Sequence, residues 1–245
     1  MRNIKITIQY DGSRYKGWQK LGNNTNTIQH KLEKTLSEIL REDIELIASG
    51  RTDAGVHAEN QVANFFTNSN ISIEKLLDFC YRSLPQDIVV KKIEEVDESF
   101  HSRFNVSQKV YTYKIHNSKI HDVFNGKYTY HVKEKLDIKK MKEAAEFFIG
   151  EHDFKSFTAL KSKNKSTIRK IYSIDFKISG ENIDIIFTGN GFLYKMVRIL
   201  AATLIEVGLG KFPAADVKRI MNEKNRSLAS DTAPAHGLFL TNVIY

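Results

Sequence analysis

The chain has 245 residues, of which 41% are hydrophobic and 27% charged, so it can build one large core or two modest ones. Its net charge of +8, with 15 phenylalanines and 10 tyrosines, suits a partner that offers phosphates and exposed bases. The single cysteine excludes an internal disulfide, and the even composition excludes a long linker or a low-complexity tract.

The first half predicts the element order β-α-β-β-α-β. Residues 4–10 alternate apolar and polar side chains, which is typical of a strand with one buried face. A helix begins near Thr27, strands cover 44–48 and 61–66, a second helix begins at Ser72, and a strand covers 87–93. Cys80 shares helical spacing with apolar neighbours, which predicts a core position. The order is that of the split βαβ, ferredoxin-like arrangement.

The second half repeats this order with one extra helix. Strands are predicted at 110–116, 169–178, 183–188 and 237–244, with a short one at 128–131, and helices from Asp137, at 193–207 and at 214–222. We therefore expect an α+β fold of two ferredoxin-like halves, residues 1–105 and 106–245. Because no residue-level repeat links the halves, this inference depends on element order alone.

Targeting, membrane and cofactor signals are weak. The first residues lead directly into a strand, so we expect no signal peptide and a cytoplasmic protein. The most apolar stretch, Met196 to Leu209, contains Arg198 and Glu206 and is too short to span a bilayer. There is no Cys-x-x-Cys or His-Glu-x-x-His spacing, and Gly189-Asn190-Gly191 lacks the rest of a dinucleotide fingerprint. Neither a metal nor a cofactor is predicted.

The most informative segment is Ser49 to His57, which places Arg51 and Asp53 two residues apart between two predicted strands. Rigid strands commonly hold functional side chains in such loops. Asp53-Ala54-Gly55 is also a turn sequence, and for an isolated Asp-x-Gly a turn cap beside a solvated arginine is the simpler interpretation. The rest of the chain argues against that interpretation.

Residues Gly50 to Ala58 resemble the signature of the tRNA pseudouridine synthase A family, in which the aspartate is catalytic. Further matches follow in the family's order: Tyr10-Asp11-Gly12-Ser13, Gly17-Trp18-Gln19, Phe100 to Phe104, Tyr111-Thr112-Tyr113, Gly189 to Tyr194, Met196-Val197-Arg198 and Ala233 to Leu238. The resemblance implies isomerisation of uridine in the anticodon arm of tRNA, at positions 38, 39 and 40. It also implies a homodimer, and two halves joined into one mainly antiparallel sheet with helices on one side and a central basic cleft.

Pseudouridine formation cuts the N1–C1′ bond of a uridine and rejoins the base through C5. Breaking that bond develops positive charge at C1′, so Asp53 can attack C1′, stabilise an oxocarbenium-like centre, or remove a ribose proton. The sequence leaves these three routes open. Hydrolytic glycosidases need a second carboxylate, and Glu59, the nearest acid, is outside the family signature, which favours isomerisation.

Three further roles follow from the resemblance. Arg198 matches an arginine thought to pair with the catalytic aspartate, and Tyr111 matches a tyrosine that stacks on the target uracil. Arg51 matches an arginine proposed to fill the space that the everted base leaves. Taken alone, Tyr111 would be a core residue and Arg198 a helix-surface residue. His57 is expected to pack the loop.

The segment 161–170 is a strongly basic loop, which is either simply solvated or contacts RNA phosphates. The candidate contacts are Lys161, Lys163, Lys165 and Arg169, together with Arg14 and Lys16. Val110 stands where members of the family often carry a second basic residue, which predicts one weaker phosphate contact. Ile199 and Ala202 replace the Asn and Gly common after Met-Val-Arg, which suggests altered helix packing and a narrower choice of target. A non-catalytic RNA-binding module and a nucleosidase that releases the base are the competing functions.

Overall fold

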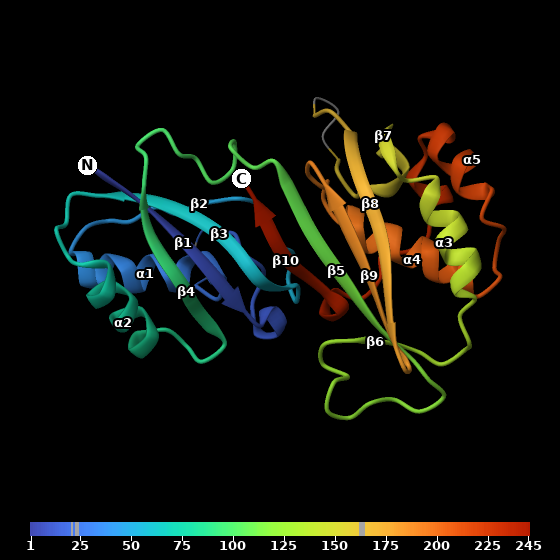
Figure 1. The fold of residues 1–245 in the computed structure, drawn as a ribbon, viewed down its shortest axis with the longest axis horizontal. Coiled ribbons are helices and arrows are strands. Elements are labelled where there is room, and N and C mark those ends of the chain that lie inside the picture. The colour runs from blue at the N-terminus through green and yellow to red at the C-terminus, as the bar shows by residue number, and fades with distance from the viewer. Residues whose placement is uncertain (21, 23–24, 162–164) are drawn as a thin grey trace. The chain divides into compact units, whose positions relative to one another are not determined.

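A computed structural model describes residues 1–20, 22, 25–161 and 165–245 and confirms the predicted α+β class (Figure 1). These residues form ten strands and five α-helices. Their contacts define two compact units: Met1–Ser107 with Phe239–Tyr245, and Gln108–Leu238. The units differ from the halves proposed from sequence in the last strand, because residues 239–245 group with the first unit.

The first unit is organised around β3 (His57–Thr67). β1 (Arg2–Tyr10) pairs antiparallel along one edge of β3, and β4 (Ile88–Val96) pairs antiparallel with β1. On the other edge of β3 lie β2 (Ile47–Ala48) and, beside His57 and Ala58, the parallel strand β10 (Leu238–Ile244). The start of β3, directly after the Asp53 loop, is therefore held by strands from both ends of the chain.

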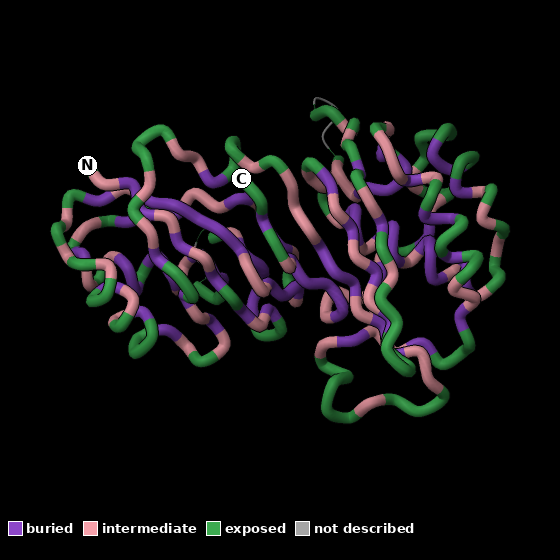
Figure 2. The backbone as a smooth tube through the Cα atoms, viewed as in Figure 1, coloured by how far each residue is buried: buried purple, intermediate pink, exposed green. Residues whose placement is uncertain are grey.

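The helices of this unit begin where side chains cap them. The Thr27 hydroxyl accepts from His30 N at the start of α1 (Ile28–Leu40), and the Ser72 hydroxyl accepts from Lys75 N at the start of α2 (Ile73–Ser83). The two helices contact each other, and both carry a buried face (Figure 2). Cys80 is fully buried in α2, as its spacing predicted.

The strand predicted at 44–48 is reduced to two residues. Two of its backbone donors are used elsewhere, since Ile44 N donates to Ser37 Oγ at 3.0 Å and Leu46 N donates to Glu33 Oε1 at 3.0 Å. Both acceptors belong to α1. Bonds to helix side chains thus replace ladder bonds that a longer strand would make.

The second unit has a sheet in the order β5-β9-β8-β7, with antiparallel neighbours. The strands are β5 (Gln108–Asn117), β9 (Asn182–Gly189), β8 (Ile168–Ser179) and β7 (Gly150–Asp153), and β6 (Tyr130–Val132) runs parallel to the end of β5. Its helices are α3 (Ile138–Glu146), α4 (Met196–Gly208) and α5 (Asp216–Glu223). None of the described helices is long and apolar enough to cross a membrane.

Three phenylalanines form a fully buried cluster in this unit. The ring of Phe148 lies 4.9 Å from Phe157 and 6.4 Å from Phe154, measured between centroids. We expect Phe157→Ala to lower the free energy of unfolding by about 3–5 kcal/mol, because it removes a large buried ring and leaves a cavity. Urea unfolding measures the change. Phe104→Ala, at a ring that is 76% exposed, serves as the control and should stay within about 0.5 kcal/mol of the parent.

Candidate active site

The loop that carries Asp53 connects β2 to β3, and its first residues are tied to β3. Ser49 N donates to Val62 O at 2.8 Å. The buried Gln61 side chain accepts from the Ser49 hydroxyl at 2.7 Å and donates to Gly50 O at 2.9 Å. One amide group therefore fixes two successive residues of the loop.

Thr52, the residue before Asp53, is held at both its side chain and its carbonyl. Its hydroxyl shares a 2.8 Å hydrogen bond with the Tyr10 phenol, and its carbonyl accepts from Trp18 N at 3.1 Å. Tyr10 is buried at the end of β1, and burial raises the pKa of its phenol, so the group keeps its proton for this bond. The backbone directly before Asp53 is thus fixed by contacts with Tyr10 and Trp18.

Asp53 itself is the first residue of a tight turn. Val56 N donates to Asp53 O at 3.2 Å, and Gly55 adopts a left-handed φ of 79° that favours glycine. Asp53 is partly exposed, whereas Val56 and Thr52 on either side are buried. Arg51 is exposed in the same loop. The carboxylate residue therefore lies at an accessible point between two anchored ones.

Two glycines from the segment that follows β1 lie in close contact with the backbone of this loop. A Cβ atom on Gly12 would lie 2.0 Å from Val56 O, and one on Gly17 would lie 2.7 Å from Thr52 O and 3.1 Å from Ala54 N. Gly17 also has a φ of 93°. The sequence identified these glycines only as family matches, and the structure shows the contact that requires them.

His57, the first residue of β3, packs the far end of the loop. Its Nδ1 accepts from Gly12 N at 3.1 Å, and its ring stacks on Phe239 with centroids 4.6 Å apart. The Asp11 carboxylate lies 3.1 Å from the same Nδ1, but an ion pair would need a proton on that atom and would break the bond to Gly12. His57 is 1% exposed, in agreement with a packing role.

The other two residues suggested by sequence belong to the second unit. Tyr111 lies on β5, paired with Phe187, and is 8% exposed. The ring of Phe192, from the loop after β9, meets it edge to face with centroids 5.3 Å apart. The Tyr111 ring is therefore held in one orientation by its neighbours.

Arg198 lies in the first turn of α4 and is partly exposed. Its Nε donates to Ala233 O at 2.8 Å, and Ala233 N donates to Arg198 O at 3.3 Å. The next residue, Pro234, accepts from the buried Tyr113 phenol at 3.0 Å, and burial raises the pKa of that phenol. The Ala233–Leu238 motif thus orients the arginine through its backbone.

The basic residues proposed to contact RNA differ in the hydrogen bonds that they make within the protein. Arg14 donates twice to Asp87, at 2.9 and 2.6 Å, and this interaction raises the pKa of the guanidinium and offsets its charge. Arg169 Nη1 donates to Ile168 O at 2.6 Å and to Ser166 O at 3.2 Å. Lys16, Lys161 and Lys165 are exposed, and Lys163 lies outside the described residues. Across the part of the chain that is described, no three His, Cys, Asp or Glu side chains are grouped to hold a metal ion.

Comparisons with known proteins confirm the family resemblance. A family model described as tRNA pseudouridine synthase matches residues 6–105 and 144–245. The chain is 53% identical to tRNA pseudouridine synthase A 1 of Clostridium tetani, with complete coverage of both chains. It is 45% identical to tRNA pseudouridine synthase A 2 of the same organism, covering 100% of this chain and 99% of that one. It is 47% identical to tRNA pseudouridine synthase A 2 of Bacillus cereus strain ZK / E33L, covering 99% of each.

Proposed function

Since the chain belongs to the tRNA pseudouridine synthase family, it isomerises uridine to pseudouridine in tRNA, and we propose that it acts at positions 38, 39 and 40 of the anticodon arm. The reaction exchanges an N1–C1′ bond for a C5–C1′ bond, and the proton that leaves C5 balances the one gained at N1. No redox partner is needed. Because the substrate is tRNA, we place the enzyme in the cytoplasm, and we propose that it works as a homodimer.

Asp53 is the catalytic residue of this proposal, and the observation that carries it is the anchored loop. Residues on both sides of Asp53 are fixed by Tyr10, Gln61 and the two glycines, while Asp53 itself is partly exposed. A negative charge held in place costs little reorganisation when positive charge develops at C1′. Covalent attack, electrostatic stabilisation and removal of a ribose proton all use this placement.

A uridine stacked in RNA cannot present C1′ to a side chain, so the target nucleotide is everted. Tyr111 then stacks on the uracil, and its edge-to-face contact with Phe192 supports this by fixing the ring plane. Arg51, exposed beside Asp53, fills the space that the base leaves, and Arg198 pairs with the carboxylate. The bond from Arg198 Nε to Ala233 supports that role, because it orients the guanidinium.

Mapping pseudouridine in tRNA tests the proposed function. Total tRNA from cells that lack this protein should lose pseudouridine at positions 38, 39 and 40, and the purified chain should restore it without releasing uracil. Free uracil would instead identify a nucleosidase. Restoration confined to other positions would retain the reaction and contradict the anticodon-arm assignment.

A pair of substitutions at Tyr111 separates stacking from hydrogen bonding. We expect Tyr111→Phe to stay within about 5-fold of the parent rate and Tyr111→Ala to fall about 100-fold, because base stacking on an aromatic ring contributes about 1–3 kcal/mol. Single-turnover rates on an anticodon stem-loop measure both. Equal losses in the two variants would show that the ring face is not what the substrate needs.

Salt dependence tests the basic loop. If Lys161, Lys163 and Lys165 contact phosphates, replacing all three with Gln should reduce the slope of log affinity against log salt by about 2, because each contact releases a counterion. The matched control replaces Lys139, Lys140 and Lys142, three exposed lysines of α3, and should change the slope by less than about 0.5. Similar slopes for the two triple variants would leave the loop as solvated surface.

A further inference from the structure

The segment between β9 and α4, residues 190–195, presents a second aromatic ring close to Tyr111. Phe192 of this segment meets the Tyr111 ring edge to face, and two residues later the side chain of Tyr194 is 52% exposed. The Cα atoms of Phe192 and Tyr194 can be at most about 7 Å apart, because only two residues of chain separate them. A single exposed aromatic side chain is ordinary, so the surroundings of this ring decide whether it has a function.

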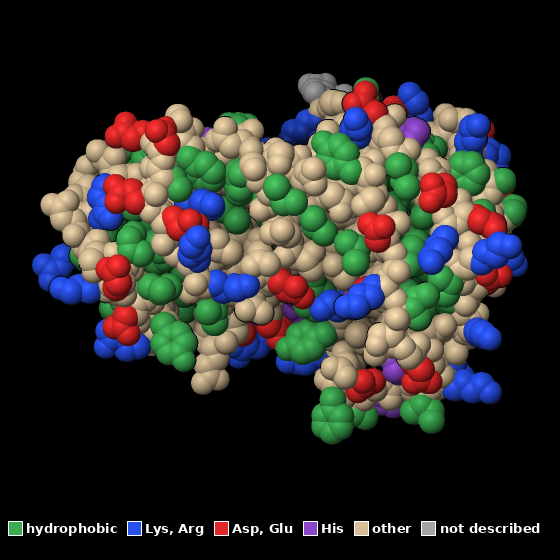
Figure 3. Space-filling model, in the orientation of Figure 1, with side chains coloured by type: hydrophobic (Ala, Val, Ile, Leu, Met, Phe, Trp, Pro, Cys, Tyr) green, Lys and Arg blue, Asp and Glu red, His purple; other side chains and the backbone are tan. Residues whose placement is uncertain are grey.

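The surroundings of the Tyr194 ring are basic. Lys195 Nζ lies over the ring, 5.3 Å from its centroid. The side chain of Arg169 lies beside Gly191, where a Cβ atom would be 3.8 Å from its Nε. Lys170 N donates to Asn190 Oδ1 at 3.0 Å, and basic side chains lie over this end of β8 and β9 (Figure 3). The exposed ring is therefore continuous with a surface that attracts phosphates.

The backbone fixes both the ring and the lysine. The Tyr194 carbonyl accepts from Ala159 N at 3.1 Å and from the Thr158 hydroxyl at 3.0 Å. Lys195 has a φ of 60°, in the left-handed region that disfavours a residue with a side chain. Such strain persists only where neighbouring contacts hold it, and it is frequent at ligand-binding positions. Little further ordering is thus needed when a ligand reaches the pair.

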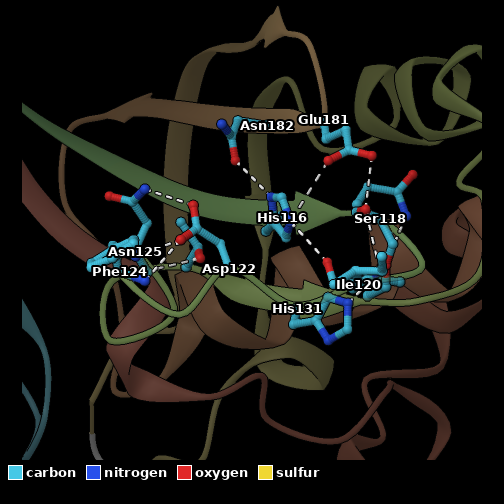
Figure 4. Close-up of polar contacts among 12 residues, drawn as sticks. His116, Ser118, Ile120, Asp122, Phe124, Asn125, His131, Glu181 and Asn182 are labelled. Atoms are coloured by element: carbon cyan, nitrogen blue, oxygen red, sulfur yellow. Dashed lines mark hydrogen bonds and ion pairs between the residues drawn. The ribbon is translucent and has the colours of Figure 1, made fainter.

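The chemistry of the pair favours RNA as the ligand. A nucleobase stacks on an aromatic ring, and the phosphate of the same nucleotide attracts an ammonium group. The exposed ring of Phe124 differs in this respect. The Asp122 carboxylate beside it accepts from Phe124 N at 2.9 Å and from Asn125 Nδ2 at 2.6 Å (Figure 4), and a carboxylate repels phosphates. Tyr194 with Lys195 therefore suits a nucleotide, and Phe124 does not.

We propose that Tyr194 and Lys195, which we call the base platform, bind the unpaired base of the anticodon loop next to a target uridine at position 38. The inference rests on the proposed function and names a further contact with its substrate. Tyr111 holds the everted uracil, the Tyr194 ring stacks on the neighbouring base, and Lys195 contacts the phosphate of that neighbour. Unpaired loop bases are what aromatic side chains recognise in RNA. Holding the neighbour limits how far the strand can slide past Tyr111.

A cycle that removes each partner in turn tests the base platform. The RNAs are an anticodon stem-loop with its uridine at position 38 and the same stem-loop with an abasic nucleotide in place of the neighbouring loop base. Tyr194→Ala on the intact RNA, or the parent on the abasic RNA, should bind about 10-fold more weakly, because one stacked base is lost. Tyr194→Ala on the abasic RNA should lose nothing more. The control Tyr81→Ala, at an aromatic residue that is 77% exposed on α2, should behave like the parent on both RNAs.

Replacement of Lys195 by glycine supplies the second readout. Lys195→Gly relieves the left-handed backbone and removes the ammonium group, so it should raise the urea midpoint and weaken RNA binding several-fold. Arg41→Gly, at an exposed basic residue with a φ of 55°, should raise the midpoint and leave binding unchanged.

The outcomes separate the base platform from the proposed function. If the parent converts the stem-loop while the losses of Tyr194→Ala and the abasic RNA multiply, the base platform alone is overturned. The same holds if Tyr194→Ala binds the intact RNA as tightly as the parent. If the parent forms no pseudouridine in the stem-loop, the proposed function is overturned and the base platform with it.

Discussion

An Asp53→Asn chain is expected to form pseudouridine at least about 10⁴-fold more slowly than the parent and to bind tRNA within about 3-fold of it. The amide has the size of the carboxylate but carries no negative charge, so it cannot attack C1′, stabilise a cation or accept a ribose proton. Removal of a group on which the chemical step depends commonly lowers the rate by a factor of about this size. Single-turnover rates and filter binding on the same tRNA measure the two quantities.

The matched control for this variant is Glu59→Gln. Glu59 is the nearest acid along the chain and lies in β3 outside the family signature, so its neutralisation should change the rate by less than about 3-fold. If Asp53→Asn kept more than about 1% of the parent rate, the carboxylate would not be the catalytic group. If tRNA binding fell along with the rate, Asp53 would act in binding instead.

Gly12→Ala and Gly17→Ala are expected to lower the rate of the chemical step by about 100-fold or more. The added methyl groups would lie 2.0 Å from Val56 O and 2.7 Å from Thr52 O, so the loop must shift. Displacement of a catalytic group by about 1 Å lowers a reaction rate by about 100-fold. Neither glycine carries a side chain that could contact substrate. Single-turnover rates and circular dichroism separate a shifted loop from an unfolded chain.

Gly210→Ala controls for backbone strain at Gly17. Gly210 has a φ of 73°, close to the 93° of Gly17, but a Cβ there would meet nothing within 4 Å. The Gly210→Ala chain should therefore lose about 1 kcal/mol of its free energy of unfolding, without a change in the rate of the chemical step. Equal rates for the Gly17→Ala and Gly210→Ala chains would mean that the Gly17 contact does not position Asp53.

The sequence predicted those elements whose burial pattern is local. β1 alternates Ile4, Ile6 and Ile8 with polar residues, and all three isoleucines are buried. β7 was missed because Gly-Glu-His-Asp has no apolar alternation, and pairing with β8 defines it. The strand at 44–48 was overestimated, because its donors bond to α1 side chains that no local pattern reveals.

In the candidate site, too, the sequence revealed what a local pattern carries and missed what distant contacts provide. Asp53 could be found because nine contiguous residues carry the family signature. The support around it comes from Tyr10, Gly12 and Gly17, which contact the loop only because β1 pairs with β3 in a particular register. Gln61 had no signal at all, since an amide in a strand is ordinary until its two hydrogen bonds are seen.

The most direct test of the central claim is a structure of the Asp53→Asn chain bound to an anticodon stem-loop. The claim predicts that the target uridine is everted and that the carboxamide lies within about 3.5 Å of its C1′, as a near-attack geometry requires. A uridine that remains stacked in the loop, or a carboxamide directed away from the sugar, would contradict it.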